Sequence, residues 1–433
     1  MDIDAHRVTT EEQLSWRGRR LHLVGMGGAG MSAYALAAHA LGAHVTGSDR
    51  VWSPYAQRLL EQTGIETLIG HRAANVPSGD DVEVVHSTAI AADNPERAAA
   101  RERGLPDRPR ADLLGEIAAT RRVIAVAGAH GKTTTAAMIA VALRAAGLDP
   151  GWLVGGEVRD LGSNAGWGTG EWLVVEGDES DRSFLALAPE VAVITNVELD
   201  HHHTYSSRAE LDDAFREFLS HSDRAVIWDR PELLALAGGI EVFPFDGDVE
   251  LPLRVPGEHN RRNAAAALVA CELAGADPRR CRDALSAFTG AKRRFEEVGT
   301  TATGARVVDD YAHHPTEVAA TLAAGRSQCP ARLVAVFQPH LFSRTRELAG
   351  DFGTALAAAD RSLVLPVYPA RERQEDFPGV DAGLIAADAH PGSFDEAAQL
   401  LAGELRDGDL CLVMGAGDVD TLGRMLVEGG EPR

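Results

Sequence analysis

The sequence predicts an α/β protein of three domains, in which helices cover largely parallel sheets. Short runs of β-branched residues alternate with longer alanine- and leucine-rich stretches along all 433 residues. At about 150 residues per domain this length suggests three domains, and a hydrophobic content of 45% is ample for buried cores. Polar junctions rich in arginine and lysine lie near residues 118 and 292. We therefore expect domains at 1–117, 118–291 and 292–433.

Apolar runs mark the expected strands, and amphipathic stretches mark the expected helices. In the first domain we expect strands at 21–24, 43–46 and 82–85 and a helix over 31–40. In the second we expect strands at 123–127, 172–175, 191–195 and 225–228 and helices over 136–143 and 264–274. In the third we expect strands at 305–308, 333–337, 362–365 and 410–414, with helices between them. Strands that alternate with helices favour parallel sheets.

Charge and cysteine usage narrow the class of protein. A net charge of −22 opposes binding to nucleic acid or anionic membrane surfaces, because lysine and arginine dominate both interactions. The four cysteines lack the spacing of a zinc site or a disulfide framework. Residues 1–20 lack the apolar core of a signal peptide, and no apolar run reaches the ~18 residues of a membrane span. We therefore expect a cytoplasmic protein that binds small anionic ligands through local positive clusters.

A glycine-rich turn at residues 128–134, GAHGKTT, is the most informative segment. It follows an expected strand and precedes an expected helix, so its backbone N–H groups lie at the positive end of a helix dipole. Lys132 adds a full charge, and Thr133 has the hydroxyl that such loops place on Mg²⁺. The strict G-x-x-x-x-G-K-[ST] pattern would have glycine where this chain has Val126. We interpret the segment as a variant phosphate-binding loop; the alternative is a glycine turn with a surface lysine.

The first domain carries a second glycine motif, GMGGAG at residues 25–30, which fits G-x-G-x-x-G between a strand and a helix. Asp49 ends the next expected strand, where a carboxylate can bind hydroxyl groups. This pattern predicts a pyrophosphate at a helix N-terminus. A dinucleotide or a UDP-sugar would both satisfy it. The structural alternative is that the glycines only permit tight packing.

Acidic and histidine residues follow two strands of the middle domain. Glu176 begins the acidic segment 176–181, and Asn196 precedes the histidines 201–203. Clustered carboxylates at the carboxyl edge of a sheet repel one another unless a cation is present, and Mg²⁺ prefers such oxygen ligands. We expect a magnesium site here. The alternatives are solvated charged loops or, for the histidines, a zinc site.

Several blocks together resemble the Mur ligase family. They are residues 25–32, 87–90, 94–96, 128–134, 176–184, 196–205, 257–264, 309–315 and 415–418, in the order and spacing of that family. The resemblance spans nearly the whole chain. It implies a Rossmann-like first domain that binds a UDP-sugar, a central ATPase domain with a P-loop-type sheet, and a Rossmann-like last domain that binds an amino acid. The implied reaction is ATP-dependent amide formation between UDP-N-acetylmuramate and L-alanine through an acyl phosphate, in peptidoglycan precursor synthesis.

The resemblance also implies roles for individual residues. Lys132 would stabilise the transferring phosphoryl group, with the nucleotide held by Gly128, Ala129, His130, Gly131, Lys132, Thr133 and Thr134. Two Mg²⁺ ions are implied, one on Thr133 and one on Glu176 and His201. Asn260 and Asn263 would contact adenine and Asp309 the ribose, although the two asparagines also suit helix capping. The UDP-sugar would lie on Gly27, Gly28, Ala29, Gly30, Met31, Ser32, Asp49, Ser87 and Thr88.

His313, His340 and Arg344 are the candidates for the amino-acid end of the site. An arginine suits a carboxylate, and a histidine can accept the proton of an amine near neutral pH. Family members often carry arginine after the histidine of the block QPH, residues 338–340 here. This chain has Leu341 at that place, so Arg344 or another arginine must hold the carboxylate. Arg344 could otherwise be a surface helix residue.

Three alternative functions stay open. The family includes a ligase that reattaches a recycled tripeptide, but its first glycine motif usually differs from residues 27–30. The carbamylated lysine of ligases that add later stem residues has no counterpart near Phe215, which favours alanine addition. A nicotinamide dehydrogenase would not use Lys132 and Glu176, and a non-catalytic nucleotide-sensing module would not need the metal ligands. We expect a monomer or a homodimer with small-molecule substrates.

Overall fold

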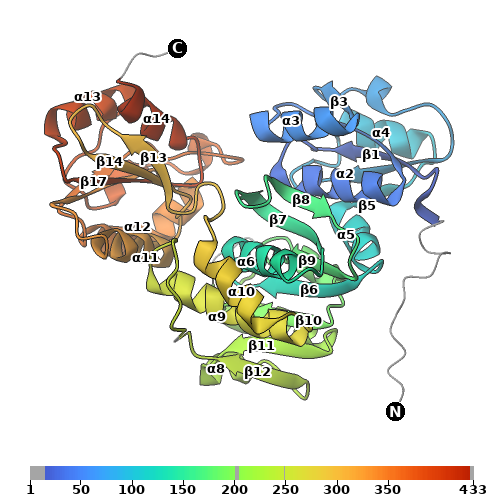
Figure 1. Cartoon of the computed structure of the whole chain (residues 1–433). Coiled ribbons are helices and arrows are strands. Elements are labelled where there is room, and N and C mark those ends of the chain that lie inside the picture. Colours follow the sequence, from blue (N-terminus) through green and yellow to red (C-terminus); the bar gives the residue numbers. More distant parts are fainter. Residues whose placement is uncertain (1–14, 200–203, 248, 430–433) are drawn as a thin grey trace. The chain divides into compact units, whose positions relative to one another are not determined.

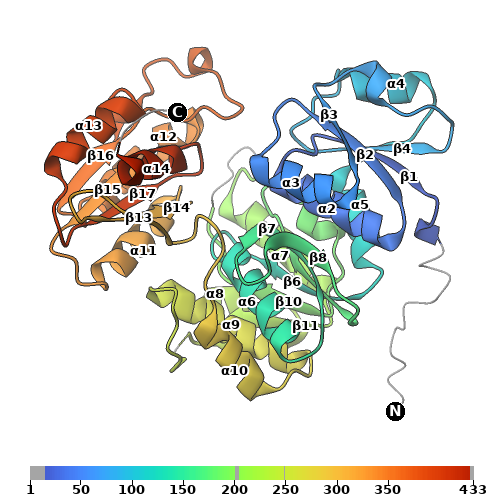
Figure 2. The same cartoon turned by 45° about the horizontal axis from the view of Figure 1, so that its top comes forward.

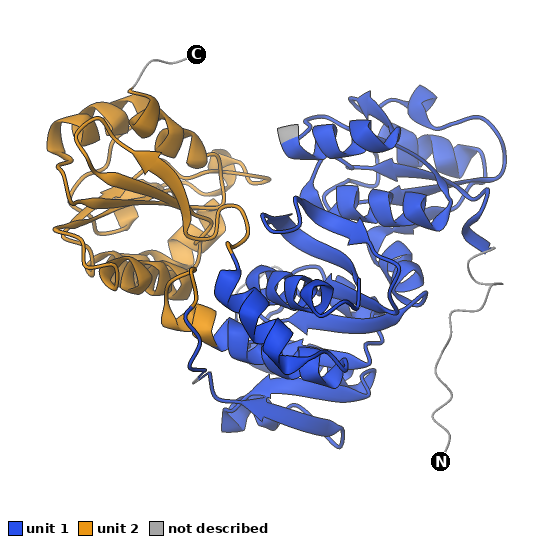
Figure 3. Cartoon of the chain, in the orientation of Figure 1, with its two compact units in different colours: residues 1–252, 262–288 blue, residues 253–261, 289–433 orange. Residues whose placement is uncertain are grey.

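The computed structural model describes residues 15–199, 204–247 and 249–429. The chain forms two compact units, the first from residues 1–252 and 262–288 and the second from residues 253–261 and 289–433 (Figure 3). The first unit contains two sheets and the second contains one (Figure 1). The predicted α/β class is confirmed, since helices connect the strands of each sheet. Within the described ranges, every helix falls short of the length or the apolar content that crossing a lipid bilayer requires.

The N-terminal sheet has five parallel strands in the order β3-β2-β1-β4-β5. Figure 2 shows β1 beside β2 and β4. Its strands are β1 (Arg20–Val24), β2 (His44–Asp49), β3 (Glu66–Ile69), β4 (Val82–His86) and β5 (Asp107–Pro109). Its helices are α2 (Ala29–Leu41), α3 (Pro54–Thr63), α4 (Pro95–Glu102) and α5 (Arg110–Ala118). The order reverses at β1, so the loops after β1 and β4 border the crevice in which open α/β sheets bind ligands.

The central sheet has seven strands in the order β12-β11-β10-β6-β9-β7-β8, and only the β7–β8 pair is antiparallel. The strands are β6 (Arg122–Ala127), β7 (Gly151–Val158), β8 (Ser163–Trp167), β9 (Trp172–Glu176), β10 (Val191–Ile194), β11 (Arg224–Trp228) and β12 (Glu241–Phe245). The helices are α6 (Lys132–Ala145), α7 (Arg208–Ser220), α8 (Pro231–Leu234), α9 (Glu258–Leu273) and α10 (Pro278–Ala287). Because β6 pairs with β9 and β10, the loops after these three strands lie side by side.

The sheet of the second unit has the order β13-β14-β17-β15-β16, with β13 antiparallel to β14. Its strands are β13 (Glu296–Thr300), β14 (Arg306–Asp310), β15 (Leu333–Phe337), β16 (Arg361–Val364) and β17 (Leu410–Met414). Its helices are α11 (Pro315–Arg326), α12 (Phe342–Leu356), α13 (Phe394–Glu404) and α14 (Asp420–Glu428). Separate apolar clusters cover the two faces of this sheet, as expected for a sheet buried on both sides.

Side-chain contacts join the two sheets of the first unit. Asn164 of β8 is fully buried, accepts a hydrogen bond from the Tyr55 hydroxyl at 2.8 Å and donates to the carbonyl of Ala29 at 2.7 Å. Arg110, at the start of α5, pairs with Asp178 and Asp181 of the loop after β9 at 2.8 and 2.7 Å. Through these contacts, α2 with its glycine motif packs against the β7–β8 hairpin of the central sheet.

Candidate functional site

The loop at residues 128–131 connects β6 to α6 and requires glycine at both ends. Gly128 and Gly131 have φ angles of +141° and +81°, which L side chains rarely adopt. A Cβ on Gly128 would lie 2.2 Å from the hydroxyl oxygen of Thr195. Val126 lies inside β6 and is fully buried, so the turn itself begins only after Ala127. Valine at position 126, where the strict motif has glycine, is therefore explained by a strand that continues to Ala127 before the turn begins.

Lys132 is the first residue of α6, and its ammonium group lies within the loop. Its Nζ donates to the carbonyls of Gly128 at 2.6 Å and Ala129 at 3.2 Å, and it lies 2.8 Å from the carboxylate of Glu179. Burial by itself would lower the pKa of Lys132, but nearby carboxylates, Glu179 first, raise it above its ordinary value. Lys132 is therefore a charged cation at the start of α6, where the predicted phosphate loop would meet an anion.

Thr133, in the first turn of α6, and Glu176, at the end of β9, bring oxygen atoms together. The Thr133 hydroxyl donates to Oε1 of Glu176 at 3.0 Å, and the amide of Gly155 donates to Oε2 at 2.6 Å. A hydroxyl and a carboxylate are the hard oxygen ligands that Mg²⁺ prefers, so this pair fits the predicted ion. His201, the third predicted ligand, lies outside the described residues.

The segment after β10 supports the loop from the other side. The amide of His130 donates to Asn196 at 2.9 Å, while the Asn196 amide and the Thr195 hydroxyl donate to the carbonyl of His130 at 2.8 and 2.7 Å. The His130 ring lies 2.7 Å from the carboxylate of Glu198. These bonds hold the turn rigidly, which favours a preorganised anion site.

The acidic segment after β9 is held by arginine and lysine charges. Burial would raise the pKa of Asp178, but Arg110, Lys132 and hydrogen bonds from Ser180 lower it to about 2. Asp178 is therefore ionised, and the positive charges of Arg110 and Lys132 compensate it.

The glycine motif lies at the carboxyl ends of β1, β2 and β4. Oδ2 of Asp49 accepts a hydrogen bond from the amide of Gly27 at 2.7 Å, and a Cβ on Gly27 would lie 2.4 Å from the carbonyl of Val51. Gly28, by contrast, has no atom within 4 Å of a Cβ position. Close packing therefore explains glycine at 27, whereas the surroundings of Gly28 leave room for a ligand.

Other predicted residues of this motif differ in what they can offer. Met31 and Ser32 are buried, and the Ser32 hydroxyl donates to the carbonyl of Ala29 at 3.0 Å, so the structure does not present their side chains to a ligand. Ser87 and Thr88 follow β4, and a Cβ on Gly25 would lie 3.0 Å from Cβ of Ser87. The structure thus brings the residues after β1 and β4 together, as expected for the point where the strand order of an open α/β sheet reverses.

Three family models match consecutive parts of the chain. They are the Mur ligase family catalytic domain over residues 20–122, the Mur ligase middle domain over residues 126–242 and the Mur ligase glutamate ligase domain over residues 293–417. A UDP-N-acetylmuramate–L-alanine ligase of Saccharopolyspora erythraea is 44% identical, over 93% of this chain and 92% of the relative. The chain belongs to the Mur ligase family. The resemblance drawn from the motifs is confirmed.

Two solved structures are similar to this Mur ligase over almost its full length. A UDP-N-acetylmuramate-alanine ligase of Thermotoga maritima has a TM-score of 0.79 and 28% identity, and the match covers 95% of this chain and 98% of that one. A murein peptide ligase of Psychrobacter arcticus has a TM-score of 0.70 and 25% identity, with coverage of 96% and 100%. The three-sheet α/β architecture is therefore that of the family.

The second unit of this Mur ligase holds Asp309 in a buried ion pair. Nε of Arg293 lies 2.9 Å from the Asp309 carboxylate, and its Nη atoms donate to the carbonyls of Gly417 and Gly415 at 2.8 and 2.7 Å. Burial, opposed by Arg293, raises the pKa of Asp309 to about 6. Asp309 therefore orients Arg293, which holds the loop after β17, and a contact of Asp309 with a ribose stays a prediction.

The predicted amino-acid residues gather at the end of β15. Nη1 of Arg344 lies 3.4 Å from Nδ1 of His340, whose ring stacks on Tyr368 and meets His313 edge to face at 6.1 Å. Arg344 is 8% exposed, so it is not a surface helix residue. Leu341 has a φ of +72°, an unfavourable conformation for leucine that places strain beside this cluster.

The two predicted adenine residues, both near the start of α9, differ in their surroundings. Within the first unit, Oδ1 of Asn263 lies 2.6 Å from where a Cβ on Gly131 would be, so Asn263 packs directly on the phosphate loop. Within the second unit, the Asn260 amide donates to the carbonyl of Pro256 at 2.7 Å. Helix packing thus accounts for part of what both residues do.

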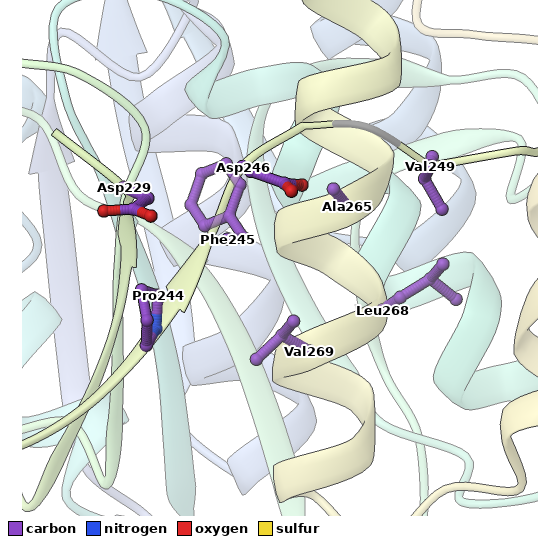
Figure 4. A pocket seen from close by; sticks show the side chains of 8 residues that line it. All are labelled: Asp229, Pro244, Phe245, Asp246, Val249, Ala265, Leu268 and Val269. Carbon is purple, nitrogen blue, oxygen red and sulfur yellow. The ribbon is translucent and has the colours of Figure 1, made fainter.

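A cavity of about 330 Å³ lies elsewhere in the first unit (Figure 4). It is lined by Asp229, Pro244, Phe245, Asp246, Val249, Ala265, Leu268 and Val269, at the ends of β11 and β12 and along α9. None of the residues predicted from the sequence lines it.

Proposed function

We propose that this chain catalyses the ATP-dependent joining of UDP-N-acetylmuramate and L-alanine, with release of ADP and phosphate, in peptidoglycan precursor synthesis. The observation that carries this proposal is the phosphate loop with Lys132 inside it, in a chain 44% identical over 93% of its length to a UDP-N-acetylmuramate–L-alanine ligase. ATP dependence is a property of the Mur ligase family, and we propose two Mg²⁺ ions for this chain.

The first chemical step transfers a phosphoryl group. The lactoyl carboxylate attacks the γ-phosphorus, the bond to the β–γ bridging oxygen breaks, and ADP leaves an acyl phosphate behind. Lys132 and the amides at the start of α6 would stabilise the charge on the transferring oxygens. Thr133, Glu176 and His201 would hold Mg²⁺, which reduces the repulsion between the substrate carboxylate and the γ-phosphate; two unit charges ~4 Å apart repel by roughly 4 kcal/mol at an effective dielectric of 20.

The second step forms the amide bond. The amine nitrogen of L-alanine attacks the acyl carbonyl, and inorganic phosphate leaves from the tetrahedral intermediate. We propose that Arg344 binds the alanine carboxylate and that His313 or His340 takes the amine proton. The 3.4 Å contact between Arg344 and His340 supports this assignment, because it places a carboxylate binder beside a base.

We also propose the remaining substrate contacts. The UDP portion would lie on the glycine motif with Gly28 at its open side, Asn263 and Asn260 would contact adenine, and Asp309 the ribose. We propose domains at 1–117, 118–291 and 292–433, each containing one of the three sheets. The enzyme would work in the cytoplasm, where ATP is available, as a monomer or a homodimer.

One assay separates this function from its alternatives. Purified protein is given UDP-N-acetylmuramate, ATP and Mg²⁺, and phosphate release is followed with L-alanine, L-serine, glycine and the recycled tripeptide. We expect release to depend on L-alanine. Release only with the tripeptide would favour the peptide-recycling ligase, and binding without turnover would favour a nucleotide sensor. Reduction of a nicotinamide cofactor would point to a dehydrogenase.

A further inference from the structure

Arg110 lies between the glycine motif at residues 25–30 and the acidic segment after β9, and no sequence pattern marks it. It is the first residue of α5, and its side chain is 13% exposed. Its Nε donates to Asp181 at 2.8 Å and its Nη2 to Asp178 at 2.8 Å. The edge of the guanidinium formed by Nε and Nη2 is therefore occupied by the acidic segment after β9.

The other edge of the guanidinium faces the glycine motif. Nη1 lies 3.1 Å from where a Cβ on Gly30 would be, at the first turn of α2. Within the described residues, Nη1 makes no hydrogen bond. It is also not fully buried, so it reaches solvent. Gly30 leaves this space open, since a side chain there would press against Nη1.

A charged donor at this position complements the backbone of α2. The first N–H groups of a helix and its dipole attract anions, and a guanidinium beside them adds a full charge and two directed donors. Because Asp178 and Asp181 fix the other edge, Nη1 is held in place before a ligand arrives. Preorganised donors of this kind bind phosphate oxygens more tightly than mobile surface arginines do.

We propose that Arg110 is a substrate-binding residue that contacts the diphosphate of the UDP-sugar through Nη1. Its contacts with Asp178 and Asp181 hold it in place and link the UDP-sugar site to the segment that carries Glu179, the partner of Lys132. This inference rests on the proposed function, because that function supplies the diphosphate ligand.

The test measures binding without turnover. Calorimetry with UDP and with UDP-N-acetylmuramate, without ATP, compares wild-type protein with Arg110→Gln. Loss of a charge-assisted hydrogen bond to a phosphate predicts ~10- to 100-fold weaker binding of both ligands. Binding of a non-hydrolysable ATP analogue should change by less than about threefold, because the bonds of Lys132 to its own loop remain. Arg108→Gln is the matched control, since Arg108 lies two residues away and pairs with Glu83 and Glu116; it should bind all three ligands as wild type does.

A double variant separates ligand contact from a purely structural role. Arg110→Gln leaves the Asp181 carboxylate without its partner, and Asp181→Asn removes that unpaired charge. If Arg110 contacts the ligand directly, binding of UDP should stay weak in the double variant. Recovery of UDP binding in the double variant would overturn the proposal, as would wild-type UDP binding by Arg110→Gln. A loss confined to UDP-N-acetylmuramate would overturn the assignment to the diphosphate.

Two further measurements keep the test decisive. If Arg110→Gln melts well below wild type, Arg110→Lys is measured in its place, because lysine keeps the positive charge. We then expect UDP to bind ~3- to 10-fold more weakly than to wild type. Unchanged UDP binding by Arg110→Lys would overturn the proposal. Failure of the proposed function is distinguishable, because wild-type protein would then show no L-alanine-dependent phosphate release with UDP-N-acetylmuramate.

Discussion

Glu96 is a fully buried carboxylate beneath the N-terminal sheet, and replacing it with glutamine tests how strongly its hydrogen bonds stabilise the first unit. Its Oε2 accepts from the hydroxyl of Ser48 at 2.6 Å and lies 3.2 Å from Nε2 of His22. Its Oε1 accepts from the Asn75 amide at 2.6 Å and the Arg72 backbone amide at 3.0 Å. A glutamine would turn one acceptor into a donor that faces these donors.

The magnitude follows from the pKa of Glu96. Burial alone would raise this pKa, but the hydrogen bonds from His22, Ser48, Asn75 and Arg72 outweigh burial and lower it from 4.5 to about 2. A depressed folded-state pKa means that the ionised form stabilises the fold above pH 4.5 and that this contribution falls as the pH drops towards 2. A difference of about 2.5 pKa units corresponds to about 3 kcal/mol at neutral pH.

Urea unfolding of wild type and Glu96→Gln, followed by tryptophan fluorescence from pH 7 to 3.5, measures this contribution. We expect the variant to be less stable by about 3 kcal/mol at pH 7, and the gap to narrow by about 1.4 kcal/mol between pH 5.5 and 3.5. Glu102→Gln, at the exposed end of the same helix, is the control and should change stability by less than about 0.5 kcal/mol. A gap that stays constant with pH, or widens in acid, would refute the reasoning.

Three further outcomes are expected. Lys132→Ala should lower turnover by about three orders of magnitude with the fold intact, and near-normal phosphate release would remove the lysine from the mechanism. Gly128→Ala should weaken binding of an ATP analogue at least about tenfold, because its Cβ would lie 2.2 Å from the Thr195 hydroxyl oxygen. The control Gly350→Ala, with open space around it, should bind the analogue normally. Equal affinities of the two variants would show that the turn does not require glycine at 128. Chelation of Mg²⁺ should abolish turnover, and Glu176→Gln should raise the Mg²⁺ concentration for half-maximal rate at least about tenfold; an unchanged requirement would exclude Glu176 as a ligand.

The central strands could be predicted from the sequence, whereas the edges of the sheets could not. The buried runs at 123–127 and 410–414 are strands because a strand covered on both faces must be apolar throughout. The edge strands β3 and β5, with sequences ETLI and DRP, are short, polar and half-exposed, so they carry no such pattern. The β7–β8 hairpin was missed too, although it joins the central sheet to α2.

The residue order along the chain determined the phosphate loop, the glycine motif and the acidic segment, because each forms from consecutive residues at the end of a strand. Only the tertiary structure decided which charges meet. Glu179 pairs with Lys132 across 47 residues of sequence, and Arg110 reaches Asp181 across 71. Such pairs depend on where the ends of separate strands and helices come to lie, and this depends on how the sheets pack rather than on any local pattern.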